Sequence, residues 1–476
     1  MNKLLLSISA AALLLGMVAC NATIDITDAS PESGLWSVSI PATKGGETTK
    51  ALAYDEVGNK ISTSFNTTDK VFVYNKTKGA LDANYLSPET DGSSVTISGA
   101  LAGNYEVGDE LTLRYGSDEW FDGHFDYEDQ TGTFETVRDF ATATVSVTAV
   151  DAVNHKLTLG NAHFTNPYSI YRFTLVNGET ADPLHGLTGD PISFNSFFIN
   201  PYGKFVCWED ADGSARYYYG DGKNETVTRE TWRDAPSTDP VWLALSHTGE
   251  AGAIEFTAID EANQTVYMCG SYFTQGLQNG KFYAPTLQMW PCMKPTITDN
   301  ASGNQVDVTK LGTLFYDDCY YTYENPGSDI SISGFGDETC IKWNWQTSTG
   351  DVTVRLADGA GFKNIQKSPI QQAGGWGRLI IELNGNCDCA TTEDNAAILI
   401  YKGIGEVVFQ GSGTLLVNAS STIGTKGISC CDANGLPKAD VPNVHAADGY
   451  TLTIEDGGTG WFEGGDHCWA YKVAPQ

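Results

Sequence analysis

The chain has 476 residues and carries 59 acidic against 28 basic side chains, a formal net charge of −31. So acidic a chain lacks the Lys/Arg-rich surface that nucleic acids and anionic lipid headgroups require, which excludes both as predicted partners. Its length exceeds one domain of about 100–200 residues, so several domains are expected.

Residues 1–20 have the layout of an export signal: Lys3, an uncharged apolar run from Leu4 to Ala19, and then Cys20. The apolar run is shorter than the ~20 residues of a membrane-spanning helix. Its end, Met17-Val18-Ala19-Cys20, resembles the lipobox of bacterial lipoproteins, in which the chain is cut before a cysteine that then takes a diacylglycerol. We therefore predict a lipoprotein signal peptide, lipidation at Cys20 and an outer-membrane, cell-surface location with membrane contact only through the lipid. The alternative is an ordinary secretory peptide with a chance cysteine.

Residues 21–178 predict a β-sandwich. One apolar alternation, Leu35–Ile40, lies in a stretch rich in Thr, Ser, Gly and Lys. Short segments of period-2 alternation follow, separated by turn residues and without any helical stripe. The predicted strands cover 70–74, 94–97, 110–114, 142–147, 155–159 and 171–176.

Residues 179–292 repeat this pattern and predict a second β-sandwich. Its expected strands cover 192–194, 204–207, 215–219, 241–245, 254–256 and 266–269.

Residues 293–476 change character, because apolar strands now recur with Gly, Asn and Asp corners in place of hairpin turns. Strands starting at 330, 352, 379 and 407 are 22, 27 and 28 residues apart. One strand and one corner per 20–30 residues predict a short right-handed parallel β-helix, which makes the whole chain all-β. The ends of such a stack need covering, and we expect the preceding sandwich and the Trp461–Trp469 tail to cover them.

Eleven cysteines are present, and eight of the ten that follow Cys20 lie from Cys292 onward. An even number in an exported chain favours disulfides. The Cys387-Asp388-Cys389 and Cys430-Cys431 spacings differ from the C-x₂-C pairs of zinc sites. Metal binding and inert buried thiols remain the alternatives.

The first two blocks resemble the fimbrillin-like proteins of Bacteroides-type bacteria. Four regions carry this resemblance in order along the chain: Asn66–Tyr74, Phe125–Phe134 with Asp139–Ala143, Phe164–Phe173, and Gln278–Tyr283. The resemblance implies two fimbrillin-like sandwiches at 21–178 and 179–292.

The resemblance also implies a mechanism of assembly. In that family an N-terminal strand is cut away at a basic residue, and the groove it leaves accepts a strand from another fimbrial subunit. Here the candidate strand is Leu35–Ile40, the candidate cut follows Lys50, and Lys44 is the alternative. The family's site is usually Arg, whereas the first Arg of this chain is Arg114. The other reading is an uncut linker lysine in a monomeric lipoprotein.

The third block suggests ligand binding. Gly411–Ala419 with Thr422–Ile428 resembles a repeat of bacterial carbohydrate-binding β-helix domains. Among its aromatic residues Trp343, Trp345 and Trp376 are candidates for stacking on surface or host glycans, with core packing as the alternative. No cofactor is predicted, and a Ca²⁺ site at Asp317-Asp318 is weighed against a solvated turn.

No catalytic motif stands out. The seven His form no H-E-x-x-H pair, and no G-x-S-x-G turn or phosphate-binding loop occurs. Arg355 and Arg378 are the only arginines of the third block, too few for a lyase that acts on acidic polysaccharide. We predict a fimbrial tip or accessory subunit, an adhesin without enzymatic activity. A glycan-binding lipoprotein that never polymerises and a polysaccharide-degrading enzyme are the alternatives.

Overall fold

The computed structural model describes most of the chain from residue 34 onward. The described residues are 34–44, 53–55, 60–62, 64–115, 131–137, 141–166, 169–179, 189–200, 205–206, 208–209, 215–216, 229–247, 252–273, 280–312, 319–347, 350–365, 367–391, 396–401, 406–419, 426–431, 437–438, 443–458 and 467–476. In these ranges the chain is all-β, as predicted, with one short 3₁₀ turn at Phe134–Thr136. No helix in the described ranges is long and apolar enough to cross a membrane.

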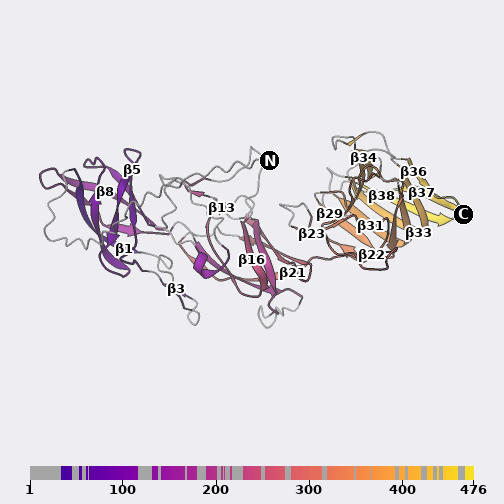
Figure 1. Ribbon diagram of the computed structural model, residues 1–476, viewed down its shortest axis with the longest axis horizontal. Coiled ribbons are helices and arrows are strands. Elements are labelled where there is room, and N and C mark those ends of the chain that lie inside the picture. The colour runs from indigo at the N-terminus through magenta and orange to yellow at the C-terminus, as the bar shows by residue number, and fades with distance from the viewer. Residues whose placement is uncertain are drawn as a thin grey trace, which may run out of the picture.

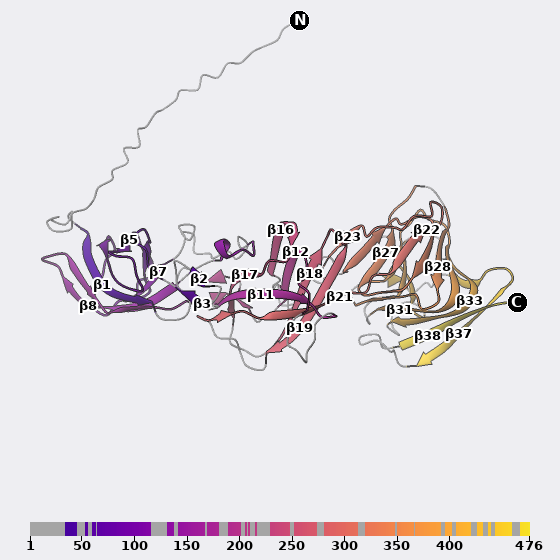
Figure 2. The same cartoon turned by 90° about the horizontal axis from the view of Figure 1, so that it is seen from below.

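Three β-rich blocks follow one another along the long axis of the molecule (Figures 1 and 2). The first is a single sheet that closes on itself, because its strands pair in the order β10-β1-β6-β5-β4-β7-β8-β9 and β9 pairs again with β1. Its strands are β1 (Trp36–Lys44), β4 (Val71–Asn75), β5 (Ala80–Pro88), β6 (Ser94–Leu101), β7 (Glu110–Tyr115), β8 (Ala141–Asp151), β9 (Lys156–Leu159) and β10 (Ala162–Phe164).

The alternation expected of these strands is present in their burial. In β8 every second side chain from Ala141 to Val147 faces the core, while those between them are more exposed. The enclosed core is aliphatic with a cluster of rings, in which Phe65 meets Tyr115 and Phe164 edge-on at 5.6 and 5.4 Å between ring centroids.

The second block is a mixed sheet with the strand order β13-β17-β11-β21-β19-β18-β12-β16, and β20 is paired to β11. Its strands are β11 (Ser169–Asn177), β12 (Phe194–Asn200), β13 (Phe205–Val206), β16 (Arg229–Ser237), β17 (Val241–His247), β18 (Gly252–Asp260), β19 (Thr265–Phe273), β20 (Phe282–Tyr283) and β21 (Thr286–Pro291). A separate pair, β14 (Trp208–Glu209) with β15 (Ala215–Arg216), lies off this sheet.

Strand β11 marks a difference from the sequence-based boundary at 178. It pairs with β17, β20 and β21, so the sheet of the second block begins at Ser169. Alternation along Tyr171–Val176 predicts a half-buried strand, but it carries no information on which sheet the strand joins. The last strand of the first sheet is β10, which ends at Phe164.

The third block contains two stacks of parallel strands. One runs β24 (Tyr321–Glu324), β27 (Thr339–Trp343), β30 (Ile370–Gln372), β32 (Ile398–Tyr401) and β34 (Ile428–Cys431). The other runs β25 (Asp329–Ser333), β28 (Val352–Ala357), β31 (Leu379–Thr391), β33 (Glu406–Ala419) and β36 (Asn443–Ala446). The strands predicted to start near 330, 352, 379 and 407 all form, and each pairs in parallel with the next.

Shorter elements complete this block. Strand β26 (Phe335–Gly336) pairs with β29 (Gly361–Asn364), which also pairs with the second half of β31. The remaining strands are β22 (Thr296–Asp299), β23 (Lys310–Leu311), β35 (Pro437–Lys438), β37 (Tyr450–Gly458) and β38 (His467–Pro475).

The interior of the third block is built from aliphatic side chains in register. Ile341, Ile370, Ile398 and Ile428 follow one another across the first stack, and all four are buried. Each of these side chains therefore lies beside its equivalent on the neighbouring strand. One contiguous core runs through the described strands of both stacks.

Both ends of this core are covered. Phe198, Ile259 and Val266 of the second block belong to the same buried cluster as the first strands of the third. At the other end, Trp469 and Tyr471 of β38 close over the last coil. Side chains of the second block thus pack on the core of the third, and Trp461 lies outside the described residues.

Candidate functional site

Strand β1 is the sequence-predicted functional element, and it is inserted between distant parts of the first sheet. One edge pairs antiparallel with β6 from Trp36↔Leu101 to Thr43↔Ser94. The opposite edge pairs parallel with β9 at Ser37 and with β10 from Ala42 to Lys44. Both edges of the groove would lose backbone partners if β1 were removed.

The inward face of β1 fills the core. Val38, Ile40 and Ala42 are 3, 1 and 1% exposed, while the residues between them face outward. These three side chains occupy successive sites along the groove, and a replacement strand would need apolar residues at the same period-2 spacing. Partly buried Trp36 packs at the start of the strand against His155, with ring centroids 5.5 Å apart.

Lys44 is the last residue of β1, and its side chain is held in place. The ammonium donates to the backbone oxygen of Ser64 at 2.9 Å and lies over the rings of Phe65 and Tyr115, 4.1 and 4.2 Å from their centroids. A protease would reach the Lys44 peptide bond only after this end of β1 had opened. Such contacts stabilise the strand end through cation–π attraction.

Lys50, like Cys20, lies outside the described residues. The chain that follows forms a hairpin, β2 (Ala53–Asp55) with β3 (Lys60–Ser62). Tyr54 of this hairpin meets Trp242 of the second block edge-on at 4.7 Å and also contacts Phe134 and Phe282. The chain downstream of the predicted cut is therefore anchored on the second block, independently of β1.

The three aromatic candidates of the third block have different surroundings. Trp343 is 1% exposed and donates its ring N–H to the Gly327 oxygen at 2.6 Å, so its ring belongs to the core. Trp345 is 61% exposed, because β27 ends at Trp343 and the next residues turn away. Trp376 is partly buried and donates to the Asn344 oxygen at 2.8 Å. Of the three, Trp345 offers the most ring surface to a ligand.

A polar network crosses the outer face of the second parallel stack. The Arg355 guanidinium donates to both carboxylate oxygens of Asp329 at 2.9 Å and to Glu382. Gln410 donates to the same Glu382 at 2.7 Å, and Asn300 donates to Asp329 at 2.6 Å. These pairs hold the pKa values of Asp329 and Glu382 below their usual range. The network joins consecutive coils, and its charges are already paired with one another.

One buried acid was missed by the sequence reasoning. Glu338 lies in the turn before β27, is 4% exposed and accepts a hydrogen bond from the backbone N–H of Ile365 at 2.7 Å. Burial raises the pKa of Glu338 to about 7. No spacing in the sequence marks this residue, because its burial depends on the coil that follows. Among the described residues no group of three or more His, Cys, Asp or Glu could hold a metal ion, and Asp317-Asp318 lies outside them.

The last strand of the chain is bound within its own block. β38 pairs antiparallel with β33 from Gly413↔Val473 to Ala419↔His467, and on its other edge with β37. Trp469, Ala470 and Tyr471 of this strand are buried. Neither edge of β38 is available to another chain unless this end of the block opens.

Comparison with known proteins gives weak structural likenesses. No protein-family model matches the chain, and no curated protein sequence matches it. Proteins assigned to cell adhesion from Bacteroides uniformis and Parabacteroides distasonis are 12 and 11% identical, with TM-scores of 0.32 and 0.30. They match over 54 and 53% of this chain and over 96 and 90% of their own. The shaft pilin SpaA of Lactobacillus rhamnosus GG is 11% identical over 54% of this chain and 98% of its own, with a TM-score of 0.22. At such scores these likenesses carry no conclusion about function.

Proposed function

We propose that this chain is a non-enzymatic adhesin of the bacterial cell surface, a tip or accessory subunit of a fimbrium. Cys20 anchors the exported chain in the outer membrane through its lipid. Cleavage after Lys50 then releases β1, and the open groove of the first block accepts a strand from another subunit. The third block is a short right-handed parallel β-helix that forms the binding head.

The observation that carries the proposal is the placement of β1. Its inward side chains Val38, Ile40 and Ala42 fill a groove bounded by β6 on one edge and by β9 and β10 on the other. A groove with two unpaired strand edges and apolar sites at period 2 is well suited to β-strand addition. The described chain after the predicted cut stays attached through Tyr54 and its ring contacts.

Strand β38 supports the terminal position in a polymer. A subunit within a stalk must donate a strand as well as accept one. Here the last strand is paired on both edges within its own block, and its inner face covers the core. Donation of β38 would expose Phe409 and Leu415, both 0% exposed. β38 is therefore a poor donor strand, which supports a subunit that accepts a strand at the groove of the first block.

Sequencing the N-terminus of the surface-exposed protein tests the cut. We expect a start at Ala51, and a Lys50→Gln variant should keep its lipid-bearing N-terminus. An intact, acylated Cys20 on all surface-exposed wild-type molecules would contradict processing and leave the monomeric lipoprotein.

A peptide of residues 34–44 tests the groove. After cleavage with a lysine-specific protease and removal of the fragment, a labelled peptide should bind the remaining protein. The same peptide with Ile40→Asp should not bind, because a carboxylate would be buried in the core. Equal binding of both peptides would contradict strand addition.

The exposed ring of Trp345 supports a second candidate function, glycan binding at the corner after β27. A glycan array probed with the full chain should give signals that Trp345→Ala abolishes. Trp290→Ala is the matched control and should keep these signals, since the exposed fractions of the two rings are similar, at 61% for Trp345 and 51% for Trp290. Loss with both variants, or with neither, would contradict a site at Trp345.

A further inference from the structure

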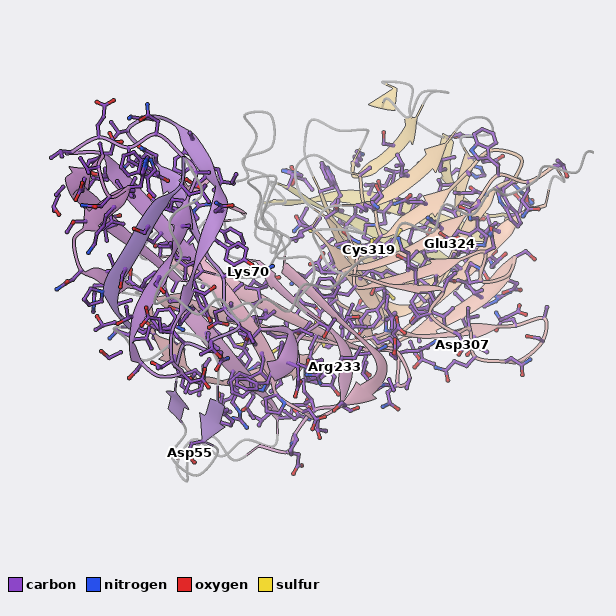
Figure 3. All side chains as sticks on the ribbon, turned by 60° about the vertical axis from the view of Figure 1, so that its left-hand side comes forward. Asp55, Lys70, Arg233, Asp307, Cys319 and Glu324 are labelled. Atoms are coloured by element: carbon purple, nitrogen blue, oxygen red, sulfur yellow. The ribbon has the colours of Figure 1, made fainter. Side chains whose placement is uncertain are left out.

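The third block holds two buried thiols in contact. Cys319 immediately precedes Tyr320 and β24, and Cys340 is the second residue of β27, the next strand of the same stack. Each is 1% exposed. Figure 3 shows the Cys319 label within the third block, beside that of Glu324 at the end of β24.

Hydrogen bonds tie the Cys319 side chain to the strand that carries Cys340. The Cys340 thiol donates to the Ser368 oxygen at 3.6 Å. The proximity of the two thiols lowers the pKa of Cys319 to about 7 and raises that of Cys340. The side-chain amide of Asn364 donates to Cys319 Sγ at 3.2 Å and to the backbone oxygen of Thr339 at 3.4 Å. One amide thus bridges the first sulfur and the residue that precedes the second.

Four other cysteines have different neighbours. Cys387 and Cys389 are two residues apart on β31, so their side chains are one full pleat apart, beyond disulfide reach. Their cross-strand partners are Leu415 and Val417 on one side, and Phe362 opposite Cys389 on the other. Cys269 lies opposite Phe256, and Cys468 lies opposite Asn418 and Gly458.

We propose that Cys319 and Cys340 form a disulfide that links the first two coils of the third block in the exported protein. In the register of β24 and β27 Cys340 lies opposite Thr322, and the backbone N–H of Tyr320, the residue after Cys319, donates to the Glu338 oxygen at 2.8 Å. The two cysteines therefore lie on adjoining segments, and the bond requires their sulfur atoms to close to about 2.05 Å. The seven cysteines whose side chains the structure describes form no disulfide in it, and the proposed bond is an addition to this structure.

The oxidant is a disulfide-bearing thiol oxidoreductase of the cell envelope. The Cys319 thiolate attacks one sulfur of the oxidant's disulfide, and the oxidant's other sulfur leaves as a thiolate. Cys340 then loses its proton and attacks Cys319 Sγ, which releases the oxidant as a dithiol. Two electrons and two protons pass to the oxidant. Because both sulfurs are buried in the finished fold, the exchange occurs while the first coil is still open.

Peptide mapping tests the proposal on the full chain isolated from the cell envelope. Free thiols are alkylated before lysis and again after unfolding without reductant. Both cysteines lie in one tryptic peptide, Leu311–Lys342. We expect this peptide to be two hydrogens lighter than the dithiol and free of alkyl groups. A second cut after Glu324 should give two fragments that separate only on reduction. Alkylation of both cysteines in the unfolded, unreduced protein would overturn the proposal.

Variants provide an independent measurement. Reductant should lower the unfolding midpoint of the third block in the wild type, by roughly 5 °C for a loop of about 20 residues. It should have no effect in a Cys319→Ser/Cys340→Ser double variant, and Cys389→Ser should keep the wild-type response. An unchanged midpoint in the wild type, or an equal drop in the double variant, would contradict a stabilising bond between these two residues.

Discussion

The first sheet and the third block distribute their strand pairing differently along the chain. In the first sheet β1 pairs with β6 and β10, which follow it by tens of residues and by more than a hundred. In the third block each strand pairs with its equivalent one coil away, as Val352 does with Leu379 and Leu379 with Val407. The first arrangement allows one terminal strand to leave while its neighbours stay connected. In the second, an inner strand such as β31 is paired on both edges by neighbouring strands of its stack, so its loss would separate the strands on either side.

The largest expected effect comes from the core of the third block. Trp343→Ala removes a buried ring and its hydrogen bond to Gly327, and should cost about 4 kcal/mol of stability. Trp345→Ala is the matched control and should cost less than about 1 kcal/mol, because that ring is mostly exposed. Hydrogen exchange resolved by region should show lower protection across the third block and unchanged protection of the first sheet. Loss of protection in β4–β8 would break the comparison.

The next effect concerns β1. Ile40→Ala deletes the most central inward side chain of the strand and should lower the stability of the first sheet by about 3 kcal/mol. Ser39→Ala, on the outward face of the same strand, should be nearly neutral. Denaturant unfolding monitored through proteolysis of β1 measures both. A third block that unfolds earlier in Ile40→Ala would show that the two regions are coupled.

A pH titration of stability sharpens the comparison, since the third block buries Glu338 in the turn before β27. Its pKa is near 4.5 in the unfolded chain and about 7 in the folded protein, so the folded state binds the extra proton between these values. Stability of the third block should therefore fall as pH rises from about 4.5 to about 7, by up to about 3 kcal/mol. Glu338→Gln should flatten this fall and still accept the Ile365 N–H. A Glu338→Gln profile equal to that of the wild type would contradict the assignment.

The smallest effect is expected from the outer polar network. Arg355→Met removes the paired charge between Asp329 and Glu382 and should cost about 1 kcal/mol, less at high salt. Lys472→Met, from an exposed pair with Glu455, is the control and should change stability little. Thermal unfolding at low and high ionic strength measures both. A larger loss that salt leaves unchanged would indicate a packing role for the Arg355 stem.

The sequence predicted the strands well where apolar and polar residues alternate regularly and turn residues separate one strand from the next. The segments at 70–74, 110–114 and 352–356 all form strands within a residue or two of the predicted bounds. It did not foresee the length of β31 and β33, since Gly385 and Gly411 resemble strand breakers. At Gly411 the backbone has φ +92°, and a Cβ there would lie 2.2 Å from the Leu383 oxygen. Glycine is needed because stacked coils approach closely, and only the neighbouring coil reveals that.

The candidate site was only partly predictable. Period-2 spacing identified β1 and its inward face before its partners were known. The position of Lys44 within the strand depends on Phe65 and Tyr115, because its ammonium lies over their rings. The local sequence pattern does not connect these two residues to Lys44. The different exposure of Trp343 and Trp345 was likewise not predictable from the local sequence pattern. A continuous strand would place both rings on one face, but β27 stops at the first of them.

The position of β38 has a consequence for how the chain is made. The last coil is completed by residues 467–475, the final strand of the sequence. A chain in which β38 had not yet paired would leave the edge of β33 open, with Phe409 and Leu415 uncovered. An exposed apolar edge of this kind promotes aggregation and proteolysis. Pairing of β38 with β33 thus protects the third block from both.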